Sequence, residues 1–390
     1  MIFLPCAETI LETRGLFSII DHMSFITALG TATPPTRLAQ STIAEFMVKA
    51  MQLEGDEARK LRALYRATGI EFRHSVIEDY GRSQSFAFYA NTDTLEPFPT
   101  TRQRLELYRT HSVALSEQAI RQAVKNLADF RWQDITHLVV VSCTGMYAPG
   151  LDIDLVKALG LRSSVQRLCI NFMGCYAAFN GIKLADTFCR ADENAKVLVV
   201  CTELCSIHFQ KENTEDNLLA NALFADGSAA VLVEGKPRKG LNLKPEGFFC
   251  DLAWQGENDM AWTVGDLGFE MRLTAYVPGV IQHGIRDLTH SLLQQLNTSF
   301  EEISYFAIHP GGKKILEAIE EALSISKAQN KHAYQVLRQH GNMSSPTVLF
   351  VLQSLTHTLN GVDGNKKILS FAFGPGLTLE SMVLSVHNHA

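Results

Sequence analysis

Short apolar runs rich in valine, isoleucine and leucine recur along this chain of 390 residues, and helix-like segments separate them. Runs of this length and composition are typical of strands that are buried on both faces of a sheet. Buried strands that alternate with helices predict an α/β fold built in layers. The runs that carry this prediction are 137–142, 196–201, 229–233, 304–308 and 367–371.

The order of these segments repeats once along the chain. The interval from Gly145, just after the first strand, to Cys175 resembles the interval from His309, at the end of a later strand, to Asn342. Such a repeat predicts two equivalent halves related by a pseudo-twofold axis. The expected divisions are an extension of little order over 1–22, a first half over 23–240 that carries the cysteine, and a second half over 241–390 that carries the histidine and the asparagine.

Composition excludes several classes of function. The net charge is -6 and no block of lysine and arginine stands out, so no nucleic-acid partner is expected. No run of 18 apolar residues exists, and the first residues lack a basic segment, so neither membrane insertion nor a signal peptide is expected. The eight cysteines form no framework of short spacings, so we expect a reducing, cytoplasmic compartment. The pair Cys201 and Cys205 has no matching Cys or His pair at metal-ligand spacing, so we expect no metal site.

Cys175 stands at an expected corner between a strand and a helix. A strand-like run over 167–172 leads into Met173 and Gly174, and small apolar residues at helical spacing follow the cysteine. The positive end of the helix dipole is expected to lower the pKa of such a thiol and to favour a nucleophilic thiolate. A buried, unreactive thiol is the alternative, because thiolate chemistry needs a base that the local sequence does not supply.

His309 and Asn342 are the candidate partners of this thiol. His309 ends a strand-like run and precedes Pro-Gly-Gly, a position where α/β folds place ligands, although a structural histidine is the alternative. Asn342 lies in a loop before a helix for which Ser345 is the expected N-cap and Pro346 the first residue. Taken alone, the Gly-Asn pair at this point is more typical of a turn than of catalysis.

Taken together, these segments resemble the type III polyketide synthases, the chalcone synthase superfamily, and most of all a bacterial-type member. The resemblance covers roughly residues 24–388 and implies a thiolase-like fold of αβαβα layers and a homodimer. The matching motifs are Asn-Phe-Met-Gly-Cys-Tyr-Ala-Ala around Cys175, Ala-Ile-His-Pro-Gly-Gly around His309, His-Gly-Asn-Met-Ser-Ser around Asn342, Ala-Leu-Phe-Ala-Asp-Gly-Ser-Ala around Phe224, and Phe-Gly-Pro-Gly-Leu-Thr-Leu-Glu over 373–380.

The resemblance also implies an activity. Cys175 would carry the acyl group of an acyl-CoA starter, and His309 and Asn342 would stabilise the enolate formed when malonyl-CoA loses carbon dioxide. Repeated condensation and cyclisation would give a pyrone, resorcinol or phloroglucinol type of product. CoA thioesters are the substrates, and no cofactor or metal is implied. A carrier-protein-dependent ketoacyl synthase that makes a single condensation is one alternative, and a thioester hydrolase with a Cys-His-Asn triad is another.

The residues expected around this trio follow from the same resemblance. Phe224 matches one gatekeeper phenylalanine, and Met271 stands where the family has a second. The expected substrate cavity consists of Thr144, Ala148, Cys205, His208, Trp262 and Ser344.

Several of these positions depart from the plant pattern. Trp262 replaces a glycine, and Ala148 stands where a bulkier residue reaches into the partner's cavity. We therefore expect a cavity of redistributed volume, either short or opened into a side tunnel. His208 is expected either to steer cyclisation or to play a structural part.

A cationic entrance for CoA is expected on a helix-like segment that carries Lys60, Arg62 and Arg66. The match is imperfect, because the family's basic positions fall on Lys60 but also on Ala63 and Ala67. A solvated helix face is the alternative for these three residues.

Overall fold

The structure, a computed structural model, describes residues 22–274 and 276–389, so nearly all of the expected extension over 1–22 lies outside the described residues. The helices are α1 (Gln40–Ala50), α2 (Gly55–Ala67), α3 (Thr101–Val124), α4 (Leu151–Leu159), α5 (Ala177–Ala191), α6 (Glu215–Leu223), α7 (Val277–Gln295), α8 (Lys313–Leu323), α9 (Lys331–His340) and α10 (Thr347–Thr356). The strands are β1 (Phe25–Ala32), β2 (Arg37–Ala39), β3 (Phe72–His74), β4 (His137–Ser142), β5 (Gln166–Asn171), β6 (Lys196–Leu204), β7 (Asp226–Glu234), β8 (Gly240–Leu252), β9 (Met260–Gly265), β10 (Gly268–Leu273), β11 (Ile303–Ile308), β12 (Lys367–Gly374) and β13 (Thr378–His389).

Across the described residues, nine strands form one sheet in the order β11-β12-β13-β8-β1-β7-β6-β4-β5. One arm contains the parallel pairs β5–β4 and β4–β6 and then the antiparallel pairs β6–β7 and β7–β1. The other arm contains the parallel pair β11–β12 and then the antiparallel pairs β12–β13 and β13–β8. The two arms thus share the change from parallel to antiparallel pairs, although the second arm has one parallel pair fewer, and they meet at the short β1–β8 contact.

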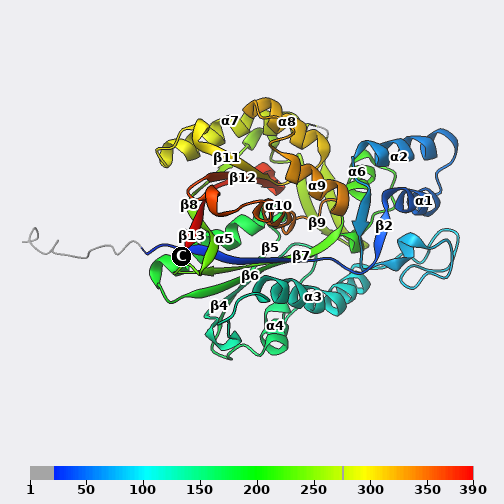
Figure 1. Ribbon diagram of the computed structural model, residues 1–390. Coiled ribbons are helices and arrows are strands. Elements are labelled where there is room, and N and C mark those ends of the chain that lie inside the picture. Colours follow the sequence, from blue (N-terminus) through cyan, green and yellow to red (C-terminus); the bar gives the residue numbers. More distant parts are fainter. Residues whose placement is uncertain (1–21, 275, 390) are drawn as a thin grey trace, which may run out of the picture.

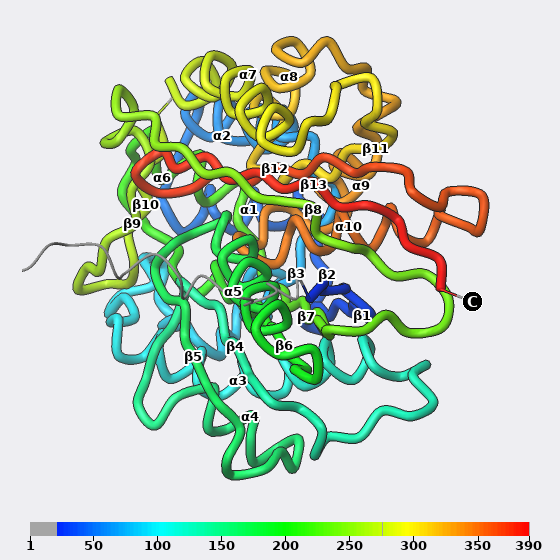
Figure 2. Tube along the Cα trace, turned by 90° about the vertical axis from the view of Figure 1, so that its left-hand side faces the viewer, coloured from blue at the N-terminus to red at the C-terminus, as the bar shows by residue number. Residues whose placement is uncertain are grey.

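The helices cover this sheet in layers. Figure 1 shows α3 and α4 on one outer side, α7 and α8 on the other, and α5 and α10 between the two arms. Figure 2, turned by 90°, keeps the same separation, with α7 and α8 at the top and α3 and α4 at the bottom. The order is therefore α/β/α/β/α, as the family resemblance implied.

The five predicted strands are all present, as β4, β6, β7, β11 and β12. Val139, Val199 and Val231 on three of these strands are fully buried, and each such side chain contributes about 1.5–3 kcal/mol of burial free energy. These strands form a rigid base whose ends carry the loops of the candidate site.

One local prediction is wrong. Helix α10 begins at Thr347 with Pro346 in the N-cap position, and no side chain caps it. The Ser345 hydroxyl instead donates to the carboxylate of Glu203 at 2.6 Å. The Ser345 side chain is therefore turned toward a buried carboxylate on β6, and its oxygen caps no backbone N–H of α10.

No helix within 22–274 and 276–389 is long and apolar enough to cross a membrane. The seven cysteines of these ranges are all free thiols, and five of them are buried.

Candidate active site

Three loops at strand and helix ends bring Cys175, His309 and Asn342 to one cavity. Cys175 lies in a short 3-10 turn, Gly174–Tyr176, between β5 and the start of α5. His309 directly follows β11, and its backbone N–H donates to the Phe371 carbonyl at 2.9 Å. Asn342 follows α9 and is held by backbone hydrogen bonds to Leu223 and Ala225. The geometry thus joins the two halves of the chain around one cavity, which we name the catalytic chamber.

Most of the predicted cavity residues lie on the wall of the catalytic chamber. Its lining consists of Cys143, Thr144, Gly174, Cys175, Cys205, Phe224, Met260, Trp262, Met271, Leu273, His309, Gly311, Ile315, Asn342, Ser344, Phe373 and Pro375. Two predicted residues are absent from this wall: His208 lines a neighbouring cavity, and Ala148 is exposed in the loop before α4.

The amide of Asn342 has a fixed orientation. Its Oδ1 accepts the backbone N–H of Ser344 at 2.8 Å, and its Nδ2 donates to the Gly311 carbonyl at 3.2 Å. The Cys175 Sγ lies 4.0 Å from the same Oδ1. Because Nδ2 carries two hydrogens, one remains for a ligand in the chamber.

Neither ring nitrogen of His309 has a hydrogen-bond partner among the described residues, although both are buried. Buried polar atoms without partners are rare, because desolvation without a hydrogen bond is costly. The imidazole therefore faces the chamber as a ready donor or acceptor for a substrate oxygen or a thiol proton.

The pKa of this thiol differs from the sequence-based expectation. Burial raises the pKa of Cys175 to about 12, and the nearby Ser344 hydroxyl and Asn342 amide offset only part of this effect. Burial also lowers the pKa of His309 to about 3. Burial thus disfavours the charged form of each group, and the expected lowering of the Cys175 pKa is wrong because desolvation outweighs the helix end.

Sequence reasoning missed Glu203, a carboxylate at the end of β6 that is fully buried behind the chamber wall. It accepts hydrogen bonds from two segments that build the site. The loop after β4 supplies the Cys143 thiol at 3.2 Å and the Thr144 hydroxyl at 2.7 Å, and the loop before α10 supplies the Ser345 hydroxyl at 2.6 Å. A single acidic residue in an otherwise apolar strand was the available signal, since such a group is buried only with hydrogen-bond partners.

A hairpin separate from the main sheet supplies one wall. Strands β9 and β10 pair in antiparallel fashion, and Trp262 is the direct partner of Met271. Neighbours in such a pair point to the same face, so both side chains reach the chamber together. The Trp262 indole Nε1 donates to the Cys143 carbonyl at 2.7 Å, which fixes the ring against the loop after β4.

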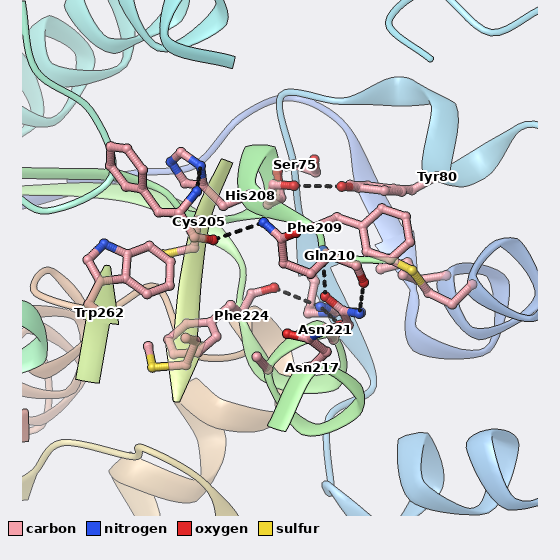
Figure 3. Close-up of a pocket in the computed structure, with 17 residues that line it drawn as sticks. Ser75, Tyr80, Cys205, His208, Phe209, Gln210, Asn217, Asn221, Phe224 and Trp262 are labelled. Atoms are coloured by element: carbon pink, nitrogen blue, oxygen red, sulfur yellow. Dashed lines mark hydrogen bonds between the residues drawn. The ribbon is translucent and has the colours of Figure 1, made fainter. Parts of the chain in front are cut away.

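Trp262 also borders the neighbouring cavity, which we name the second chamber (Figure 3). The two chambers share Cys205, Phe224, Trp262 and Met271, and each has a volume of about 40 Å³. Figure 3 shows Trp262 and His208 on one side of the second chamber and Tyr80 on the opposite side. These four shared residues therefore form a partition between two small cavities.

His208 is held on both ring nitrogens. Its Nδ1 accepts the backbone N–H of Phe269 at 3.0 Å, so its Nε2 carries the proton and donates to the Thr144 carbonyl at 2.7 Å. The ring stacks on Phe269 at 4.1 Å, and burial lowers the pKa of His208 to about 3. The geometry favours the structural alternative for this histidine, because neither nitrogen is free for a substrate.

The three predicted CoA residues lie on different faces of α2. Arg62 forms two hydrogen bonds with Glu45, at 2.7 and 2.8 Å, and together with Arg66 it borders a separate surface hollow. Lys60 lies on the face of Leu64 and Ala67, at spacings of four and seven residues.

That face borders a third cavity of about 170 Å³, which we name the entrance cavity. It shares Leu273, Gly311 and Ile315 with the catalytic chamber. Its lining also includes Lys313 and Lys314 at the start of α8. The entrance cavity is thus the one that places cationic side chains next to the trio, and Arg62 and Arg66 lie outside its lining.

Comparison with known proteins identifies the family. The N-terminal domain of the chalcone and stilbene synthases matches residues 20–237, and their C-terminal domain matches residues 250–387. A similar protein of Mycobacterium tuberculosis, "Alpha-pyrone synthesis polyketide synthase-like Pks18", is 30% identical over 370 residues, which cover 93% of this chain and 91% of that protein. A "Putative chalcone synthase" of Bacillus subtilis is 29% identical over 377 residues, which cover 93% of this chain and 99% of that protein.

One longer relative and two solved structures are also similar to this chain. "Probable polyketide synthase 1" of Dictyostelium discoideum is 30% identical over 372 residues, which cover 93% of this chain but only 11% of that protein. The solved C-terminal type III polyketide synthase domain of Steely1, a type I/III hybrid from Dictyostelium, superposes with a TM-score of 0.85 at 28% identity, covering 93% of this chain and 99% of that one. The polyketide synthase PKS-I of the brown alga Ectocarpus siliculosus gives a TM-score of 0.86 at 28% identity, covering 93% and 98%.

With a layered thiolase-like fold, a Cys-His-Asn chamber shared by its two halves, and matches over nearly its whole length, this chain belongs to the chalcone and stilbene synthase family and is a type III polyketide synthase, an acyltransferase of the condensing type.

Proposed function

We propose that this enzyme loads an acyl-CoA starter on Cys175, extends it with malonyl-CoA and releases a cyclised product. The observation that carries the proposal is the convergence of Cys175, His309 and Asn342 on one apolar chamber. No other residues are needed to form and break the covalent bonds, and we propose that the reaction uses no metal and no bound cofactor.

Loading requires the Cys175 thiolate. Burial disfavours the charged form of each group taken alone, but transfer of the thiol proton to His309 forms an ion pair without changing the net charge of the site. The thiolate attacks the thioester carbonyl of the starter, its acyl group passes to sulfur, and the CoA thiolate leaves with a proton.

Extension begins when the malonyl group loses carbon dioxide. The electron pair of the broken C–C bond moves toward the thioester oxygen, where His309 and the free hydrogen of Asn342 Nδ2 can donate. Donors preorganised in this way contribute about 3–4 kcal/mol each to transition-state stabilisation. The enolate carbon then attacks the acyl group on Cys175, the thiolate leaves, and the chain is two carbons longer. The apolar ring of Phe224 favours loss of the charged carboxylate as neutral carbon dioxide.

The chamber walls suggest a short product. Pockets for drug-sized ligands are usually about 300–1,000 Å³, whereas each chamber here has about 40 Å³ on either side of the Trp262 partition. We propose short acyl starters, few extensions and a pyrone as product. The Mycobacterium relative, whose name refers to α-pyrone synthesis, supports this choice over a resorcinol or phloroglucinol.

We propose that CoA enters through the entrance cavity, with its phosphates near Lys60, Lys313 and Lys314. Lys314→Ala should raise the KM for malonyl-CoA about fivefold with little change in kcat, which is the size expected for one exposed charge contact of about 1 kcal/mol. Arg62→Ala, on the other side of α2, is the matched control. An equal rise in KM for both variants would contradict this route.

We also propose a homodimer in the cytoplasm. Strand β5 is the end strand of the sheet, and its side chains are mostly exposed on both faces. An unpaired edge of this kind is a template for pairing with a second copy, and Met146, in the nearby loop that contains Ala148, is 43% exposed. Sedimentation at micromolar concentration should give twice the mass of the chain, and a single-chain mass would contradict the dimer.

Purified enzyme incubated with malonyl-CoA and starters of graded length tests the main proposal. Mass spectrometry should show products extended by several two-carbon units, together with release of carbon dioxide. A carrier-protein-dependent ketoacyl synthase would make one extension and would require a carrier protein. A thioester hydrolase would release free acid and CoA without carbon dioxide, and that outcome would overturn the proposal.

A further inference from the structure

Arg73 on β3 is a buried cation that the proposed reaction does not use; it is only 5% exposed. Its Nη1 donates to two carbonyls at the end of α6, that of Asn221 at 2.8 Å and that of Phe224 at 2.7 Å. A cation is favoured at this place, because the carboxyl end of a helix carries partial negative charge and carbonyls that have no partner inside the helix. Arg73 thus caps the helix that ends directly before Phe224.

Two further side chains complete this cap. The Tyr65 hydroxyl donates to the same Asn221 carbonyl at 3.0 Å. The Gln40 amide donates to the Ala222 carbonyl at 2.7 Å and accepts the Nε–H of Arg73 at 2.8 Å, which fixes the orientation of the guanidinium group. Its third nitrogen, Nη2, has no partner among the described residues. The hydrogen bonds of Nη1 and Nε therefore attach Arg73 to the end of α6.

The end of α6 is also joined to the loop that carries Asn342. The backbone N–H of Asn342 donates to the Leu223 carbonyl at 2.9 Å, and the Asn342 carbonyl accepts the N–H of Ala225 at 2.8 Å. Phe224 and Asn342 thereby pair in an isolated parallel bridge. A displacement of the end of α6 would therefore move a wall residue and a proposed oxyanion donor of the catalytic chamber together.

Arg73 packs against this loop as well. Gly341 has a φ of +71°, and a Cβ at this position would lie 3.0 Å from the Arg73 Cγ and 3.0 Å from the Leu223 carbonyl oxygen. Glycine is thus required both by the backbone conformation and by the close approach of the arginine stem. The contacts of Arg73 therefore reach both segments, the end of α6 and the loop of Asn342.

Arg73 borders the second chamber but lies outside the lining of the catalytic chamber. We propose that Arg73 is a positioning residue for decarboxylation: by holding the end of α6, it sets the places of the Phe224 ring and the Asn342 amide against the malonyl group. The inference rests on the proposed function of the Cys-His-Asn trio.

This role separates the two steps of the proposed reaction. Loading uses Cys175 and His309, which stand on the loops after β5 and β11. Decarboxylation also uses the Asn342 amide beside Phe224. Loss of the Arg73 contacts should therefore slow decarboxylation and spare loading, whereas a general loosening of the fold would slow both steps.

Arg73→Met tests the inference, because it keeps an apolar stem and removes the hydrogen bonds. We expect kcat for malonyl-CoA decarboxylation to fall about tenfold, since a misplacement of about 1 Å can cost up to about 100-fold. The KM for malonyl-CoA should stay within about twofold. The rate of starter loading, measured as the acyl-enzyme mass after rapid quenching, should also stay within about twofold.

Arg73→Lys should recover part of the decarboxylation rate, because the ammonium group keeps the charge and can reach one of the two carbonyls. It also decides the question if Arg73→Met does not fold. Tyr65→Phe, which removes the second donor to the Asn221 carbonyl, should slow the same step by a smaller factor.

Arg286→Met is the matched control. The Arg286 Nε donates to the Ala322 carbonyl at 2.7 Å, at the end of α8 that lies away from the entrance cavity. This variant should leave both rates unchanged. An equal fall of loading and decarboxylation in the Arg73 variants, or an unchanged kcat for decarboxylation in both, would overturn the inference. Failure of the unmodified enzyme to load a starter or to release carbon dioxide would instead overturn the proposed function.

Discussion

The loops that carry Cys175, His309 and Asn342 are held in place differently from the partition between the two chambers. The trio stands on loops at the ends of β5, β11 and α9, and these loops are tied to neighbouring elements by backbone hydrogen bonds. Trp262 and Met271 of the partition stand on the β9–β10 hairpin, which pairs with no strand of the main sheet and is anchored mostly by side chains, with one backbone hydrogen bond from Thr101 to Asp266 at its tip. Its tip contacts Thr101 at the start of α3, and Trp262 is fixed by one hydrogen bond to Cys143.

From this difference we infer that the residues that carry out the reaction and the residues that select the product are held in place independently. Backbone hydrogen bonds depend little on side-chain identity, so the loops of the trio keep their geometry while neighbouring residues change. A wall held by side chains changes shape when one side chain changes. We therefore expect substitutions in the trio to abolish reaction steps, and substitutions in the partition to alter the product while the decarboxylation of malonyl-CoA continues.

The largest expected effect is at Cys175. Cys175→Ala should abolish chain extension, because no acyl group can be carried to the enolate. Cys175→Gln should also lose condensation but keep the decarboxylation of malonyl-CoA, since His309 and Asn342 remain. Carbon dioxide release and product formation, measured in the same reaction, check both outcomes. Extension by Cys175→Ala would show that another group is the nucleophile.

Asn342→Ala should reduce the decarboxylation rate by about 10²–10³-fold, the usual cost of removing one oxyanion donor. The loss should appear in kcat, because the donor acts on charge that develops in the transition state. Asn342→Asp, which places an oxygen against the Gly311 carbonyl, should be at least as slow. A change confined to KM would mean that this amide only binds the substrate.

Trp262→Gly should change the product by joining the two chambers. Trp262 has the largest side chain that both chambers share, so the loss of its indole ring should allow longer products or longer starters. Mass spectrometry of the products checks this expectation. Trp262→Phe, which keeps an aromatic ring without the hydrogen bond to Cys143, is the matched control and should give an intermediate result.

The smallest expected effect concerns His208 and stability. In the folded state burial lowers the pKa of His208 to about 3, whereas the usual pKa of 6.5 applies to the unfolded chain. The unfolded state binds more protons between these values, so the contribution of His208 to stability is complete above pH 6.5 and is lost as the pH falls through this window. In His208→Gln the free energy of unfolding should fall less steeply with falling pH, by up to about 1.4 kcal/mol per pH unit. Denaturant unfolding between pH 4 and 7 measures this slope. Identical slopes for the two proteins would contradict a buried neutral ring.

The sequence predicted the loops of the trio because each is a local pattern at the end of an apolar strand. It could not predict the direction of the pKa shift of Cys175, since burial depends on segments distant in the chain, and burial outweighed the helix end. The sequence also gave no direct sign of the role of Glu203, because the groups that donate hydrogen bonds to its carboxylate come from distant loops around Cys143 and Ser345. The faces of α2 illustrate the same limit, because only the fold shows that Arg62 pairs with Glu45 while Lys60 lies on the side of the entrance cavity.

The separation of reaction from selectivity is tested most directly by measuring, on Trp262→Gly, the rate of malonyl-CoA decarboxylation and the distribution of product lengths in one experiment. Our account predicts a decarboxylation rate within about twofold of the unmodified enzyme, less than 0.5 kcal/mol in the barrier, together with longer products. Unchanged product lengths, or a decarboxylation rate that collapses with the partition, would contradict it.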